Sequence, residues 1–307
     1  MLVLDLGVFH RKTHRIALKE AILWSVFWIS LAVGMNTLIY VKLGPELGME
    51  FLAGYLLEKS LSVDNLFVFL LIFSYFKVPA VYQHRVLFMG VLGAIMMRAA
   101  MIWVGVALIS HFHWILYIFG VILIISGVKM GLSDDEQVDP EQNPVVRWVR
   151  GFFPITADYQ REHLFVRLDG VLYGTPLLIV LVALETTDVI FALDSIPAVF
   201  GVTQDPFIVY SSNIMAILGL RALYFALAGL MEYFHLLRYG LGLILVFIGT
   251  KMLIEDYVTI TTPVALGVIG GVLALSVALS LLFKPPEIRE HPEVPEEDPI
   301  PVEAKAD

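Results

Sequence analysis

Apolar runs of about 20 residues recur along most of this 307-residue chain, and they constrain its fold more than any other feature. Runs of that length can cross the hydrocarbon core of a bilayer as helices. Apolar residues make up 58% of the chain and charged residues 16%, whereas soluble domains average about 45–50% and about 25%. This composition excludes an ordinary soluble enzyme. A bacterial-type barrel is excluded as well, because its strands would alternate polar and apolar residues.

We predict eight complete membrane spans with an alternating charge pattern in the loops between them. Lys and Arg gather in the N-terminal linker, in the loops on the same side and after the last span, and the opposite loops have almost none. Because basic residues favour the cytoplasmic side, the linker, the long middle loop and the tail are expected in the cytoplasm. The predicted spans are 21–43, 51–76, 86–109, 113–130, 174–199, 207–230, 236–254 and 263–283.

The spans divide the chain into six parts. We expect membrane lipid around the spans and protein partners at the middle loop, and no basic face suggests nucleic-acid binding. The acidic, proline-rich composition of the tail predicts that it is disordered. The parts are an apolar stub, linker and first complete span (1–50), a first three-span unit (51–132), the cytoplasmic loop (133–172), a second three-span unit (173–255), the last span (256–283) and the tail (284–307).

The two three-span units carry the same landmarks in the same order, offset by 122 or 123 residues. An odd number of spans places the second unit upside down relative to the first, and inverted repeats with a site at their interface are common in transporters. We therefore predict an all-α, polytopic transmembrane bundle with two inverted three-helix repeats. The landmarks are Met97-Arg98-Ala99, Phe112-His113 and Gly127-Val128-Lys129-Met130, matched by Leu220-Arg221-Ala222, Phe234-His235 and Gly249-Thr250-Lys251-Met252.

The middle loop contains two local signals. Residues 144–153 mix arginine with aromatic side chains, which predicts a short helix lying in the lipid headgroups. Residues 165–173 carry an Asp-Gly pair between apolar residues, which predicts a small hairpin. We expect packing or regulation here rather than chemistry.

Charged residues fall inside the predicted spans, where each costs about 2.5–3.5 kcal/mol on insertion scales. Left unpartnered, the eight would cost roughly 20 kcal/mol, so they are expected to face inward. Five acids against three cations leave two surplus negative charges, which one divalent cation or two protons would balance. Metal and protons would then compete for the same oxygens. The eight are Glu58, Asp64, Glu185, Asp188, Asp194, Lys59, Arg98 and Arg221.

Helix geometry limits how these acids can share one ion. Glu185 and Asp188 lie on one helix face, but Glu58 and Asp64 differ by about 240° and about 9 Å of rise. Either the two acidic helices meet, or one of them unwinds, and Pro197 beside Ser195 favours a break in the second.

The available ligands indicate which ion such a site would take. Carboxylate, amide and hydroxyl oxygens suit hard cations such as Mn²⁺, Mg²⁺ or Ca²⁺. The chain has no cysteine, which excludes thiolate metal sites, and its histidines fall in loops or at helix ends. Neutral oxygens could come from Asn65, Thr187, Ser195 and Asn213. Arg98 and Arg221 are expected to pair with the acids and hold the empty state together.

Two motifs resemble a known family. Glu58-Lys59-Ser60-Leu61-Ser62-Val63-Asp64-Asn65, and Glu185-Thr186-Thr187-Asp188 followed by Asp194-Ser195-Ile196-Pro197-Ala198, are similar to the signature motifs of the TerC family of bacterial integral membrane proteins. The likeness runs from about Leu4 to Lys251. It implies a place in the LysE-type transporter superfamily, a bacterial inner-membrane location and manganese export, with links to tellurite resistance and to metal loading of exported proteins. The family's metal-site acids correspond to Glu58, Asp64, Glu185, Asp188 and Asp194.

These observations predict a transporter rather than an enzyme. It would export divalent metal cations, above all Mn²⁺, in exchange for H⁺, with Mn²⁺ as the transported or bound ion. The alternative is a non-transporting membrane protein that loads metal onto exported proteins or anchors a tellurite or metal stress-resistance complex. An intramembrane aspartyl protease is disfavoured, because the chain lacks a Gly-x-Gly-Asp motif.

Overall fold

The structure is a computed structural model that describes residues 18–132, 143–152, 154–160, 162–168, 170–227 and 236–283. Within these ranges it leaves out the side chains of Leu18, Asp64, Phe67 and Ala80. The predicted N-terminal stub, the first ten residues of the middle loop and the predicted disordered tail lie outside the described residues.

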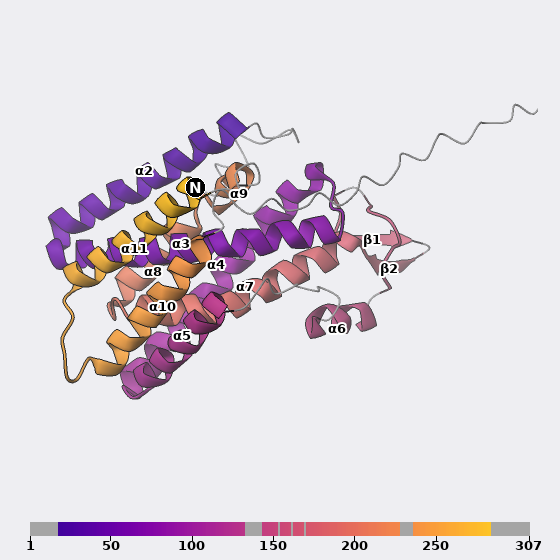
Figure 1. Ribbon diagram of the computed structural model, residues 1–307. Coiled ribbons are helices and arrows are strands. Elements are labelled where there is room, and N and C mark those ends of the chain that lie inside the picture. Colours follow the sequence, from indigo (N-terminus) through magenta and orange to yellow (C-terminus); the bar gives the residue numbers. More distant parts are fainter. Residues whose placement is uncertain are drawn as a thin grey trace, which may run out of the picture.

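Long helices dominate the described chain, and they lie side by side in one bundle (Figure 1). Their apolar sequences and scarcity of internal breaks favour helices that satisfy every backbone hydrogen bond internally, as lipid requires. The polytopic helical class predicted from the sequence is confirmed. The bundle helices are α2 (Leu18–Leu43), α3 (Pro45–Tyr75), α4 (Ala80–His111), α5 (Ile115–Leu132), α7 (Pro176–Phe200), α8 (Pro206–Ile217), α9 (Leu220–Leu227), α10 (Leu237–Ile254) and α11 (Thr262–Leu282).

Each predicted span coincides with one of these helices or with a bent pair. Among the described residues, six helices are long and apolar enough to cross a bilayer: α2, α4, α5, α7, α10 and α11. The α8–α9 pair passes the same test only as a span bent by 42°. Helix α3 has 31 residues, but Glu58, Lys59 and Asp64 interrupt its apolar sequence. Helix α3, which carries these charges, contacts α2, α7, α8 and α11.

The helices pack in a regular pattern around α3 and α7. Helix α3 contacts α7 and α8, α4 contacts α7, and α5 contacts α10 along most of its length. Three apolar clusters fill the described bundle. The two larger ones contain Leu57 and Ile102, and Leu66 and Leu184, and the third contains Phe51. The charged residues of α3, α4 and α7 lie where these helices meet.

Helices α5 and α10 cross through glycines that bring the two backbones into contact. A Cβ atom on Gly127 would lie 2.5 Å from the carbonyl oxygen of Gly242, and one on Gly249 would lie 2.5 Å from that of Gly120. Gly120, in the first half of α5, contacts Gly249, in the second half of α10, and Gly127 contacts Gly242. The two helices therefore run antiparallel. Only glycine permits this approach.

The break predicted in α7 is wrong, and the break lies elsewhere. Helix α7 continues through Pro197 to Phe200, because a proline in the last turn removes a single backbone hydrogen bond near the end of the helix. The interruption falls instead between α8 and α9, where Gly219 has φ of +84° and packs against the Trp28 side chain. The left-handed conformation at Gly219 explains why the chain turns there.

A small cap formed by the middle loop, referred to below as the loop cap, lies at one end of the bundle (Figure 1). It consists of helix α6 (Pro144–Phe152) and the antiparallel strands β1 (Phe165–Leu168) and β2 (Val171–Gly174). The helix and the hairpin predicted in the middle loop are both confirmed. In α6, Val146 is fully buried while Trp148 and Phe152 are exposed, so the helix presents an aromatic face away from the bundle.

Candidate ion site between α3, α4 and α7

Arg98 and Asp188 form a buried ion pair that joins α4 to α7. Arg98 Nε donates to Asp188 Oδ2 over 3.1 Å, and Arg98 Nη2 donates to Asp188 Oδ1 over 2.8 Å. Arg98 is 2% exposed and Asp188 is 3% exposed. This two-bond geometry is the strongest arrangement between a guanidinium and a carboxylate. The predicted pairing of Arg98 with the acids is therefore present.

The same guanidinium also reaches α3. Arg98 Nη1 forms an ion pair with Glu58 Oε1, and Glu58 is fully buried. Nη1 also lies 3.4 Å from Ser195 Oγ. Ser195 follows Asp188 by two turns of α7, so both residues lie on the face toward α4. One cation thus connects two carboxylates from the two acidic helices.

Glu185 lies one turn before Asp188 on α7 and adds a third carboxylate. Its oxygens pack against Gly93 of α4, at the position where any other residue would carry its Cβ atom. Glu185 Oε2 has no hydrogen-bond partner among the described residues. Asp188 lies close enough to repel Glu185 electrostatically. Gly93 therefore gives the Glu185 carboxylate the space to sit between α4 and α7.

Further polar atoms line the inner face of α3. Ser62 follows Glu58 by one turn and Asn65 by two, so the three residues share a face, and all are buried. Glu58 Oε2 and Ser62 Oγ have no hydrogen-bond partner within the described part of the chain. The same holds for both amide atoms of Asn213 on α8, the helix that packs beside α3. Such buried, unsatisfied oxygens are rare unless water or an ion completes their coordination.

The structure separates Asp194 from this set. Asp194 accepts a hydrogen bond of 2.7 Å from Ser126 Oγ of α5, and Lys129 lies within electrostatic reach. Asp194 follows Asp188 by six residues, about 240° around the helix, and so faces α5 instead of α4.

Two more of the predicted site residues, Asp64 and Arg221, lie on α3 and α9. The Asp64 side chain lies outside the described residues, although Asp64 itself is within α3. Arg221 is buried on α9, just after the α8–α9 break. Among the side chains that the structure describes, no three His, Asp or Glu residues converge at metal-ligand spacing.

Lys59 makes a contact that sequence reasoning did not predict. Its Nζ donates to the backbone oxygen of Ala216 over 3.1 Å, in the last turn of α8. The C-terminal carbonyls of a helix lack partners and carry partial negative charge. The ammonium of Lys59 therefore stabilises the end of α8 at the break, away from the acids that flank Arg98.

Among the described side chains, the site contains more negative than positive charge. Glu58, Asp188 and Glu185 carry three formal negative charges, and Arg98 supplies one positive charge in contact with two of them. Ser62, Ser126 and Gly93 were not among the site residues predicted from the sequence. The spacing of Ser62 from Glu58 could have revealed it, but the partners of Ser126 and Gly93 come from other helices.

The fold and the site together define a class: a multi-pass helical membrane protein with carboxylates and a guanidinium buried between its helices. Within that class, the family described as "Integral membrane protein TerC family" matches residues 43–287, and the chain belongs to it.

Curated relatives cover nearly the same length. The chain is 51% identical over 282 residues to "Uncharacterized membrane protein STKORF319" of Myxococcus xanthus, covering 92% of this chain and 88% of that protein. It is 51% identical over 285 residues to "Putative membrane-bound redox modulator Alx" of Escherichia coli (strain K12), covering 90% and 89%. A membrane protein of Rickettsia bellii is 42% identical over 284 residues, covering 92% and 94%. No solved structure matches the chain.

Proposed function

We propose that the protein exports divalent metal cations, with Mn²⁺ as the main substrate, through the carboxylates between α3, α4 and α7. One observation carries the proposal: a single guanidinium is shared by Glu58 and Asp188, while Glu185 lies beside them without an ion-pair partner among the described residues. Buried negative charge in this excess needs a mobile cation or protons. The donor set of carboxylate, hydroxyl and amide oxygens suits a hard cation.

Arg98 and the metal ion neutralise the same carboxylates in turn. With no metal bound, the guanidinium neutralises Glu58 and Asp188. When a cation arrives, it takes those oxygens together with Glu185, and Asn65, Ser195 and Asn213 add neutral oxygens. Asp64 would join from α3. Asp194, on the α5 side, would form a second position along the path. Protons replacing the metal on the same carboxylates would couple export to H⁺ entry.

We also propose that the two three-helix units are inverted repeats, in a LysE-type transporter. The glycine contacts at the α5–α10 crossing support this. At an offset of 122 residues, Gly120 of the first unit corresponds to Gly242 of the second, and Gly249 of the second corresponds to Gly127 of the first. Exchanging the units therefore converts the Gly120–Gly249 contact into the Gly242–Gly127 contact, which is also present. The packing of α3 on α8 corresponds in the same way to the packing of α7 on α4. A two-fold relation between units of opposite orientation is the common basis of alternating access.

Reconstitution of the full chain into proteoliposomes tests the proposal. Vesicles containing a Mn²⁺-sensitive dye should show protein-dependent Mn²⁺ flux, accelerated by an opposing proton gradient. Asp188→Asn should reduce the flux to the level of protein-free vesicles. Asp158→Asn, at an exposed carboxylate between α6 and β1, should transport as the unsubstituted protein does. Flux that is equal in both variants would exclude the proposed site.

The second candidate is a membrane protein that passes metal to exported proteins without transporting it. It shares the carboxylates and predicts Mn²⁺ binding without flux, so the same vesicles distinguish the two. Some relatives carry a name that includes redox modulation. The 307-residue chain contains no cysteine, so a redox effect of these residues would not proceed through their own thiols.

A further inference from the structure

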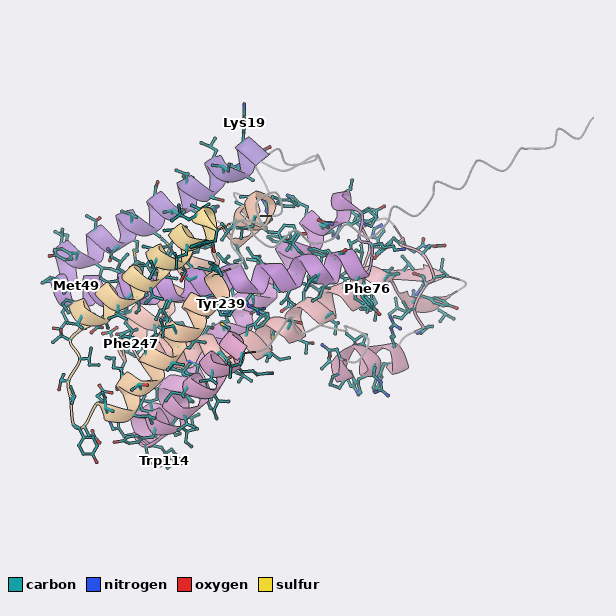
Figure 2. All side chains as sticks on the ribbon, in the orientation of Figure 1. Lys19, Met49, Phe76, Trp114, Tyr239 and Phe247 are labelled. Atoms are coloured by element: carbon teal, nitrogen blue, oxygen red, sulfur yellow. The ribbon has the colours of Figure 1, made fainter. Side chains whose placement is uncertain are left out.

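A cavity of about 660 Å³ opens beneath the loop cap, outside the proposed ion site. It lies where the C-terminal end of α3 meets the N-terminal end of α7, and α6 and the segment 154–157 cover it. Figure 2 shows Phe76, one of its lining residues, at the end of α3 that faces the strands. Its size is within the range of small-molecule sites, about 300–1,000 Å³.

The lining combines two cations with an apolar surface. Lys77 follows α3, Arg150 comes from α6, and none of the described residues that line the cavity is acidic. The remaining surface is apolar or weakly polar and includes Phe76, Ile155 and Ile179. The occupant that fits is therefore an anion attached to an apolar body. A small, fully hydrated anion would use only the basic part of this lining.

The cavity wall is held in place by backbone hydrogen bonds. Thr156 N donates to Gly174 O and Gly174 N donates to Pro154 O, each over 2.9 Å, so Ile155 forms an isolated parallel β-bridge with the last residue of β2. Tyr159 Oη donates over 2.6 Å to Phe76 O and ties this segment to the end of α3. The wall is thus preorganised, which lowers the entropy cost of binding.

Lys77 has an unusual backbone conformation at the cavity. Its φ is +49°, a left-handed value that no other non-glycine residue adopts in the part of the chain that the structure describes. Lys77 N donates to Ser74 O over 3.0 Å and Val78 N donates to Phe73 O over 2.9 Å, so the left-handed residue closes the C-terminus of α3 in a Schellman motif. Glycine is the commonest residue at such a position, and here a lysine places its side chain at the cavity instead.

The position of the cavity indicates where the anion comes from. Helix α6 presents Trp148 and Phe152, which are 63% and 65% exposed and have ring centroids 4.5 Å apart. Together with its arginines this is the composition of a helix lying at the lipid headgroups. Basic pockets at the ends of membrane helices bind the phosphates of anionic lipids. We propose that the cavity binds the phosphate headgroup of an anionic phospholipid through Lys77 and Arg150.

Native mass spectrometry of the delipidated full-length protein tests this assignment. Dioleoyl phosphatidylglycerol is the probe, dioleoyl phosphatidylcholine the zwitterionic control and inorganic phosphate the soluble competitor. One phosphatidylglycerol per chain should bind at least about tenfold more tightly than phosphatidylcholine, because two basic contacts favour the anionic lipid. Millimolar phosphate should not displace it.

The test variant is Lys77→Asn with Arg150→Gln, since asparagine tolerates the left-handed conformation. The matched control is Arg147→Gln with Arg167→Gln, which removes the same charge from exposed positions of the loop cap that do not line the cavity. The test variant should lose the preference for phosphatidylglycerol, and the control should keep it. Thermal unfolding of both variants checks that they fold.

Three results would overturn the assignment. Equal loss in the two double variants would show general attraction of lipid to a basic surface. An unchanged preference in the test variant would remove the cavity from lipid binding. Displacement by phosphate at the concentration of the lipid would identify a soluble anion as the ligand. None of these readouts depends on metal transport, so the outcome is independent of the proposed export function.

Discussion

Arg98 Nη2 on α4 and Asp188 Oδ1 on α7 lie 2.8 Å apart, in a pair from which water is almost excluded. The same guanidinium holds Glu58 of α3. Three helices are therefore joined through one side chain. Breaking a buried pair by removing one partner typically costs about 3–5 kcal/mol, because the remaining charge is left unpaired.

Arg98→Gln is accordingly expected to destabilise the purified protein by about 3–5 kcal/mol in the absence of metal. If Mn²⁺ can take the place of the guanidinium, saturating Mn²⁺ should raise the melting temperature of this variant more than that of the unsubstituted protein. Thermal unfolding with and without Mn²⁺ measures both effects. Arg147→Gln on the exposed face of α6 is the control. Equal metal-induced shifts in all three proteins would argue against competition between Arg98 and the ion.

Asp188 and Asp194 should differ in their effects on transport. Asp188 is paired to Arg98, whereas Asp194 bonds to Ser126 on another face of α7. We expect Asp188→Asn to abolish Mn²⁺ flux and Asp194→Asn to reduce it only partly. Initial rates in the same proteoliposomes measure the difference. If both variants are equally inactive, Asp194 belongs to the main site and must move toward it during the cycle.

The glycine crossing of α5 and α10 gives a stability test. Gly127→Ala would force a Cβ atom toward the Gly242 carbonyl oxygen, and overpacking of this kind costs about 1–3 kcal/mol. Gly131→Ala, one turn further along α5, meets nothing within 4 Å and should stabilise the helix slightly. Melting temperatures of the two variants report the contrast.

The α5–α10 crossing also allows a test of the proposed symmetry between the two units. If the three-helix units are related by a two-fold axis, Gly249→Ala should lower the melting temperature about as much as Gly127→Ala does. A large effect at only one of these two positions would contradict an equivalent relation between the units.

Lys59→Met is expected to loosen the end of α8. The lost hydrogen bond from a charged donor to Ala216 O contributes about 1.5–3 kcal/mol. Backbone amides around the α8–α9 break should exchange hydrogen faster in this variant, as mass spectrometry of deuterated peptides would show. Lys42→Met, at the exposed end of α2, should leave this exchange unchanged. Unaltered exchange in Lys59→Met would mean that Gly219 and Trp28 alone hold the break.

Local patterns in the sequence predicted the elements, and contacts between helices decided the site. The apolar runs located every long helix, and the Asp-Gly pair located the hairpin. The six-residue spacing of Asp188 and Asp194 already implied different faces. The sequence did not reveal that Arg98 binds both Glu58 and Asp188, because that depends on how α3, α4 and α7 approach one another. Pro197 suggested a break, but its place in the last turn made it harmless, whereas Gly219 was overlooked.

The glycine contacts between α5 and α10 bear on how the molecule could move. Side chains at an interface can change rotamer and let two helices slide, but at Gly127 and Gly249 the two backbones are in direct contact, which leaves less room for sliding. If one three-helix unit rotates relative to the other, the rotation axis passes near this crossing. The helices farthest from the crossing then move most. The distance of a helix from Gly127 and Gly249 then determines how far that helix moves.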